Sequence, residues 1–205
     1  MSAGRCLTER EWDRALRIQT IGRADETGAK YMPYEPTPYP VLERLAASGF
    51  LRPDDHLLDY GCGKGRVAFF LAARIGCRVT GIDHSEKLVA MAEANRARAA
   101  CAARTRFLRA RAEDYEPREE NAFFFFNPFS EAVLRVVLRR VARARPRDAR
   151  LILYYPSDAF LACLAETDWL RPTGEIDCRD LFGGNPRERV VMYEAAARSE
   201  RGGII

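Results

Sequence analysis

Apolar residues recur along the chain in two alternating patterns, short continuous runs and runs with helical spacing. The short runs predict strands at His56–Tyr60, Arg78–Asp83, Thr105–Arg109, Phe123–Phe126 and Leu151–Tyr155. Between them, apolar residues three or four positions apart predict helices. The run of four phenylalanines is apolar at every position, as in a parallel strand covered on both faces. This alternation indicates an α/β, Rossmann-like doubly wound sheet.

The N-terminal region departs from this alternation. A capping box at Thr8 and Glu11 predicts a helix through about Ile21. Four prolines between positions 31 and 40 exclude regular structure there, because proline lacks an N–H and pushes its predecessor to extended conformations. A further helix is expected over Val41–Ser48. We therefore expect a helical and proline-rich extension before the sheet.

The C-terminal part differs in another way. Weaker strands at Trp169–Ile176 and Arg189–Glu194 follow each other without a helix, so the otherwise parallel sheet should include an antiparallel strand. We divide the chain into a helical and proline-rich cap segment (1–39), a binding domain (40–195) and a C-terminal tail (196–205).

Composition narrows the class of protein. The 205 residues are 47% apolar and carry a net charge of +4, which is typical of a globular domain. No apolar run approaches the roughly 18–20 residues of a membrane span, and the charged start does not resemble a secretion signal. We expect a cytoplasmic protein with no membrane partner. Six cysteines and two histidines show no zinc-site spacing, so no metal is predicted.

Arginine supplies nearly all the positive charge and clusters at Arg96–Arg111 and Arg135–Arg150. One interpretation is a face that binds phosphate groups. The other is a solvated helix surface. Composition alone leaves both open.

The most informative segment is Leu57-Leu-Asp-Tyr-Gly-Cys-Gly-Lys-Gly65. A strand ends near Asp59, three alternating glycines follow (Gly61, Gly63 and Gly65), and a helix begins. Glycines let a ligand approach the backbone closely. The phosphate-binding pattern Gly-x-x-x-x-Gly-Lys-Ser/Thr is absent, and a nicotinamide motif would have glycine where Arg66 stands. The acidic residue before the glycines favours a nucleoside cofactor of another kind.

Acidic and polar residues follow the next strands. Asp83 ends the second strand, where a carboxylate can accept two ribose hydroxyls. Glu113 and Asp114 follow the third strand, where either can accept the amino group of adenine. Asn127-Pro128-Phe129 follows the phenylalanine run, at the sheet edge where such folds bind ligands.

With these motifs, residues 40–193 resemble class I S-adenosylmethionine-dependent methyltransferases, and bacterial members without an assigned substrate share the Tyr-Glu-Pro-Thr-Pro-Tyr and Asn-Pro-Phe segments. The resemblance implies a seven-stranded sheet of order 3-2-1-4-5-7-6 and S-adenosyl-L-methionine as cofactor. It places the three glycines and Asp59 beside the methionine part, Asp83 at the ribose, and Glu113 or Asp114 at the adenine. His84 would then lie against the adenine ring.

The resemblance also suggests an acceptor site. Asn127, Pro128 and Phe129 are similar to the Asn/Asp-Pro-Pro-Tyr/Phe motif of enzymes that methylate amino groups, although the second proline is missing. Asn127 is therefore predicted to contact the acceptor, with the aromatic ring beside it. A turn followed by a core phenylalanine explains these residues equally well.

The proline-rich segment supplies further candidates. We predict Glu35 as a substrate-side carboxylate and Tyr34 and Tyr39 as a lid over the cofactor. Methyl transfer needs an oriented neutral nucleophile and little protein chemistry beyond positioning and exclusion of water. Solvent exposure and loop packing explain these three residues as well.

The acceptor stays open at this stage. An amine on a protein or small molecule is favoured, because the net charge is modest and the arginines are interleaved with acids. In one lysine methyltransferase group a Tyr-x-Pro-Thr-like segment also precedes the glycine motif. RNA methylation and a non-catalytic domain that senses S-adenosylmethionine are the alternatives.

Overall fold

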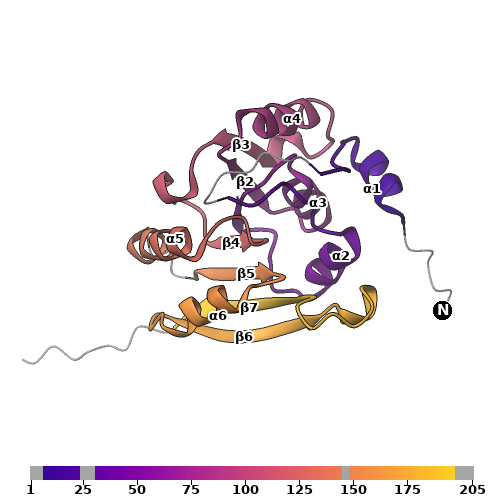
Figure 1. The fold of residues 1–205 in the computed structure, drawn as a ribbon. Helices are drawn as coiled ribbons and strands as arrows, with labels where there is room; N and C mark the ends of the chain where they lie inside the picture. The colour runs from indigo at the N-terminus through magenta and orange to yellow at the C-terminus, as the bar shows by residue number, and fades with distance from the viewer. Residues whose placement is uncertain (1–6, 24–30, 145–147, 197–205) are drawn as a thin grey trace, which may run out of the picture.

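The computed structural model describes residues 7–23, 31–144 and 148–196. One sheet of seven strands forms its centre (Figure 1). The strands are β1 (His56–Tyr60), β2 (Arg78–Asp83), β3 (Thr105–Arg109), β4 (Ala122–Phe125), β5 (Arg150–Tyr154), β6 (Leu170–Asp177) and β7 (Arg189–Ala195). Their spatial order is β3-β2-β1-β4-β5-β7-β6, which confirms the expected order. The first five pair in parallel, and β7 is antiparallel to both β5 and β6.

Helices cover both faces of the sheet, as the alternating pattern predicts. They are α1 (Glu9–Leu16), α2 (Tyr39–Ala47), α3 (Arg66–Arg74), α4 (Glu86–Arg96), α5 (Glu131–Ala144) and α6 (Asp158–Ala165). Three short 3₁₀ helices join them at η1 (Ala102–Arg104), η2 (Ala112–Asp114) and η3 (Arg179–Leu181). Helices α1 to α4 contribute to one apolar layer, and α5 and α6 pack in the other. None of these helices is long and apolar enough to cross a membrane.

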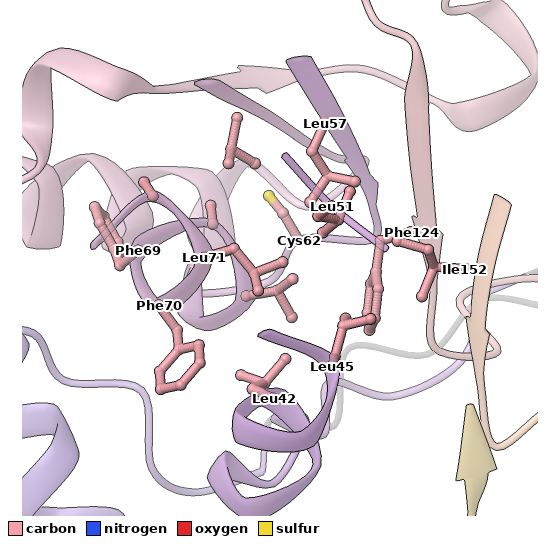
Figure 2. Packing of buried hydrophobic residues seen from close by; sticks show 14 of the residues in the cluster. Leu42, Leu45, Leu51, Leu57, Cys62, Phe69, Phe70, Leu71, Phe124 and Ile152 are labelled. Carbon is pink, nitrogen blue, oxygen red and sulfur yellow. The ribbon is translucent and has the colours of Figure 1, made fainter. Parts of the chain in front are cut away.

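The phenylalanine run shows why β4 lies at the centre. Phe124 points into the layer of α2 and α3, whereas Phe123 and Phe125 point into the layer of α5. At most 1% of each of the three residues is exposed to solvent. Figure 2 shows Leu42 and Leu45 of α2 packed between α3 and the side chain of Phe124. A strand apolar at every position therefore lies between two helical layers.

The N-terminal helix is shorter than its sequence pattern suggests. It was expected through about Ile21 but ends at Leu16, and Arg17 adopts a left-handed backbone with φ of 59°. The reason is the Asp13 carboxylate, which accepts hydrogen bonds from the Thr20 amide at 2.6 Å and the Thr20 hydroxyl at 2.7 Å. These bonds turn the chain back along its own helix.

Helix α2 begins earlier than expected, at Tyr39 instead of Val41, with Pro40 in its first turn. Strand boundaries agree with the predicted ranges to within one residue at each end. The carboxyl ends of β1, β2 and β4 meet at one edge of the sheet, and that edge carries the candidate site.

Candidate cofactor and acceptor site

A glycine loop, residues 61–65, joins β1 to α3. Gly61, Gly63 and Gly65 have φ values of +74°, +53° and +87°, in the region that side chains rarely adopt. A Cβ on Gly61 would lie 2.6 Å from the Cβ of Pro128, and one on Gly63 would lie 2.2 Å from the Tyr34 ring. The alternating glycines are therefore required both by backbone conformation and by what lies directly against them.

Asp59, near the end of β1, is a carboxylic acid in an unusually buried position. Its side chain is 2% exposed, and its Oδ2 atom has no hydrogen-bond partner. Burial, with a smaller contribution from the charge of Asp83, raises the pKa of Asp59 to about 8. Asp59 lines a cavity at the sheet edge together with Gly61. A buried, unpaired carboxylate oxygen beside a cavity is suited to bind a cationic group.

Asp83 ends β2 and lines the same cavity. Its Oδ2 accepts a hydrogen bond from the Gly63 amide at 3.0 Å, and its Oδ1 accepts one from the Ser85 amide at 2.9 Å. The carboxylate thus holds the glycine loop against the start of α4. Carboxylate oxygens accept several hydrogen bonds, so Asp83 retains acceptor capacity for hydroxyl groups.

Residues 31–37, which we call the strap, cover the cavity. All seven line it. An antiparallel bridge joins Tyr31 to Phe129, and the Met32 amide donates to the Pro128 carbonyl at 3.3 Å. The Tyr34 ring lies on the glycine loop, and its hydroxyl donates to the Thr20 carbonyl at 2.7 Å. The structure therefore places Tyr34 where a lid residue was expected.

Glu35 also lines the cavity, but its carboxylate is half-exposed. It forms an ion pair with Arg23 at 2.7 Å between Oε1 and Nη2. The position is compatible with the predicted substrate-side role, because the side chain lies at the rim where an acceptor can enter.

Arg66 holds the N-terminal region to the site. It follows Gly65, and its side chain is 2% exposed. Its Nε donates to the Thr20 hydroxyl at 2.7 Å, and its Nη1 donates to Glu9 and to the Thr37 carbonyl. One buried guanidinium therefore connects α1, the strap and the glycine loop. In the sequence it served only to exclude a dinucleotide motif, and no local signal identified this role.

The far end of the cavity lies between β2 and β3. Tyr31 stacks on His84, with ring centroids 4.0 Å apart and planes inclined by 21°. The Tyr31 hydroxyl donates to Glu113. His84 and Glu113 are thus brought together as the sequence suggested. Tyr31 was not foreseen, because the stack joins residues far apart in the chain.

Asp114 is placed differently from its neighbour. It is exposed and lies outside the cavity lining, since it forms the last residue of η2 and faces solvent. Glu113 is also absent from that lining, but its carboxylate contacts a lining residue, Tyr31, and this contact favours Glu113 of the two acidic candidates for adenine.

Asn127 does not contact the cavity as predicted. Its Nδ2 donates to the Tyr155 carbonyl at 2.5 Å, and its Oδ1 accepts from the Ser157 amide at 3.3 Å. Asn127 and Tyr155 both have positive φ, at 38° and 51°. The amide thus connects the carboxyl ends of β4 and β5. Its neighbours Phe126 and Pro128 line the cavity instead.

Two aromatic predictions also change. Tyr39, expected as a lid, is fully buried in the core, where its hydroxyl donates to Asp13 at 2.6 Å. Because Tyr39 lies in the core and does not line the cavity, the prediction that it forms a lid is wrong. Phe129 lines the cavity, but its ring packs edge-on against Tyr60 and Phe125. Its arrangement is that of a core residue.

Several arginines of the two clusters are neutralised locally. Ion pairs join Arg109 to Glu86, Arg135 to Glu131 and Glu166, Arg140 to Glu116, and Arg150 to Asp55. These contacts favour the solvated-surface interpretation over a phosphate-binding face.

Comparison with known proteins agrees with this fold. The methyltransferase domain family matches residues 57–146. An RNA methyltransferase from Salinibacter ruber, solved with S-adenosyl-L-homocysteine, has a TM-score of 0.64 at 19% identity, over 82% of this chain and 98% of that one. Mitomycin 7-O-methyltransferase has a TM-score of 0.59 at 18% identity, over 77% of this chain and 53% of that one.

A local sequence match points to a third protein. The histone-lysine N-methyltransferase of Dictyostelium discoideum that is specific for lysine 79 of histone H3 is 45% identical over 49 residues. The match covers 24% of this chain and only 2% of that protein.

The sheet order, the antiparallel β7 and the glycine loop with an acidic residue before it define a Rossmann-like methyltransferase fold. Residues 57–146 match the methyltransferase domain family, and this match together with the fold supports a class I S-adenosylmethionine-dependent methyltransferase with S-adenosylmethionine as its cofactor. The match sets aside the dinucleotide-binding alternative.

Proposed function

We propose that the protein transfers the methyl group of S-adenosylmethionine to an amine on a protein or small molecule. The observation that carries this proposal is that two of the three carboxylates lining one cavity lie in different environments. Asp59 is buried and unpaired in its wall, whereas Glu35 is half-exposed at its rim. The first suits the cofactor's ammonium and the second suits an amine acceptor that arrives from solvent.

The residues present fit the cofactor. The unpaired Asp59 oxygen would accept hydrogen bonds from the methionine ammonium, and the bare backbone at Gly61 and Gly63 would let the ligand approach. Asp83 would accept the ribose hydroxyls. His84, which lines the cavity, and Glu113, which contacts the same tyrosine, Tyr31, would hold the adenine.

When bound, S-adenosylmethionine supplies a methyl group on a positively charged sulfur. The contribution of the chain is to orient the partners and to exclude water. Tyr34 covers the glycine loop, and the strap forms the cavity roof. Glu35 would attract an ammonium acceptor, and its exposure gives the departing proton a path to solvent.

An amine on a protein is supported by the local match to a histone-lysine methyltransferase. The pairing of the arginine clusters with acids weighs against RNA. The similar RNA methyltransferase covers nearly the same length, however, so an RNA enzyme of this fold needs no added module. The two acceptors must therefore be separated by experiment.

The test uses an excess of methyl-labelled S-adenosylmethionine and a cell extract that keeps its own small molecules. Wild-type protein is compared with Asp59→Asn, and the product is divided into protein, RNA and small molecules by protease and ribonuclease sensitivity. We expect label in protein or small molecules with wild type only. Label that ribonuclease releases would contradict the amine acceptor. Cofactor binding without any labelled product would identify a sensor domain instead.

Glu35→Gln tests the substrate-side role within the same assay. It removes the charge at the cavity rim while keeping the size of the side chain. We expect a raised KM for the acceptor and unchanged cofactor affinity. An unchanged KM would leave Glu35 only as the partner of Arg23.

A further inference from the structure

The contacts of Tyr31 have the chemistry of a bound purine. Its ring stacks on His84 at 4.0 Å between centroids. Its hydroxyl donates to the Glu113 carboxylate. Adenine likewise combines a flat aromatic ring with a hydrogen-bond donor, its amino group, at the edge of the ring.

We propose that Tyr31 is an internal competitor of adenine, which occupies the adenine site and is displaced when the cofactor binds. This inference rests on the proposed function, since it takes His84 and Glu113 as the adenine contacts. It adds that the strap and the cofactor exclude each other at this end of the cavity.

The space available requires displacement. A ring inserted between two others needs contacts of about 3.5–4 Å on each side, and the Tyr31–His84 separation of 4.0 Å accommodates none. The cavity encloses about 60 Å³, against roughly 300–1,000 Å³ for small-molecule sites. Adenine therefore cannot stack on the face of His84 that Tyr31 covers without moving Tyr31.

Displacement is feasible because Tyr31 is held lightly by the rest of the fold. In the described part of the chain, the backbone of Tyr31 is joined to the fold by the bridge to Phe129, and the adjacent Met32 amide donates over a long 3.3 Å. Tyr34, three residues on, is anchored more firmly through its buried hydroxyl bond to Thr20. We expect the strap to open at Tyr31 and remain closed at Tyr34.

This competition would couple cofactor loading to the acceptor side. The strap that carries Tyr31 also carries Glu35 at the cavity rim. The binding-competent fraction of the protein sets the apparent affinity, so removal of the competitor raises it. S-adenosylhomocysteine and adenosine should respond alike, because both contain adenine.

The experiment measures both ligands by calorimetry on the full chain. Tyr31→Ala removes the ring, and Tyr31→Phe keeps the stack but loses the bond to Glu113. Tyr115→Phe is the matched control, because it removes a tyrosine–glutamate bond, to Glu120 at 2.7 Å, outside the cavity lining. We expect about tenfold tighter binding for Tyr31→Ala, a smaller gain for Tyr31→Phe and no change for the control.

A second readout uses the unaltered protein. Hydrogen exchange of the Met32 amide should accelerate when adenosine or S-adenosylhomocysteine binds, since its bond to Pro128 opens with the strap. Unchanged or weaker binding in both Tyr31 variants, or slower exchange at the Met32 amide, would overturn the proposal that Tyr31 competes with adenine. Absence of S-adenosylhomocysteine binding to every form, wild type included, would instead overturn the cofactor site.

Discussion

Replacement of Asp59 by asparagine gives the sharpest test of the cofactor site. Burial and the nearby charge of Asp83 raise the pKa of Asp59 to about 8. Asp59 must be ionised to pair with the ligand's ammonium, so binding at neutral pH requires loss of a proton. Affinity should therefore rise as the pH approaches 8. At higher pH it should fall again, once the α-ammonium of the ligand loses its proton.

The expected change in affinity between pH 6 and pH 8, the acid limb of the profile, follows from the Asp59 pKa of about 8. Roughly 1% of a carboxyl group with a pKa of 8 is ionised at pH 6, and half of it is ionised at pH 8. The affinity of wild type should differ by up to about 50-fold between these pH values. Asp59→Asn carries no titrating group, so its affinity should be about the same at pH 6 and pH 8 and weaker than wild type at pH 8.

The same substitution has a signature in stability. Because the folded-state pKa of Asp59 is raised, its contribution to stability is present at low pH and is lost as the pH rises through about 8. Asp59→Asn should therefore melt at a higher temperature than wild type at pH 9. This result would also show that weaker binding in the variant is not caused by misfolding.

The assay is calorimetric titration with S-adenosylhomocysteine at pH 6, 7, 8 and 9. Asp114→Asn is the matched control, because Asp114 is exposed and outside the cavity lining. It should keep the wild-type profile. A wild-type affinity independent of pH between 6 and 8, or an acid limb that persists in Asp59→Asn, would refute the role of Asp59.

Three further substitutions test other parts of the site. Gly63→Val, whose Cβ would lie 2.2 Å from the Tyr34 ring at a φ of +53°, should lower Tm by several degrees and abolish binding, as thermal scanning and titration would show. Asp83→Ala should weaken S-adenosylhomocysteine at least tenfold through lost charge-assisted bonds; unchanged affinity would exclude Asp83 from the ribose site. Asn127→Ala removes two bonds across β4 and β5 and should lower Tm by roughly 2–10 °C with cofactor affinity unchanged. Loss of turnover at an unchanged Tm would instead support the original prediction that Asn127 contacts the acceptor.

Most of the fold could be read from the sequence because its cause is local. A strand buried on both faces must be apolar throughout, and the Phe123–Phe126 run predicted β4 to within one residue. The glycine loop could also be predicted from the sequence, because backbone with positive φ at alternating positions disfavours residues with side chains and leaves a pattern of glycines. The order of the strands came from family resemblance, because periodicity carries no information about neighbours.

The parts of the site that sequence could not supply depend on contacts between distant residues. Arg66 bonds to Glu9 across 57 positions, and Tyr31 bonds to Glu113 across 82. No local pattern distinguishes these partners from ordinary surface charges and rings. Asn127 is a further example. Its motif could be recognised in the sequence, but the direction in which its side chain points could not be predicted.

The sequence by itself determined a class I methyltransferase fold and the residues at the carboxyl ends of its strands, because strand and loop preferences depend on near neighbours. Tertiary structure decided which of those residues share one cavity. It left Asp59 buried without a partner, laid the strap over the glycine loop, and turned Asn127 toward β5. Burial and long-range hydrogen bonds set these outcomes, and both exist only once the chain has folded.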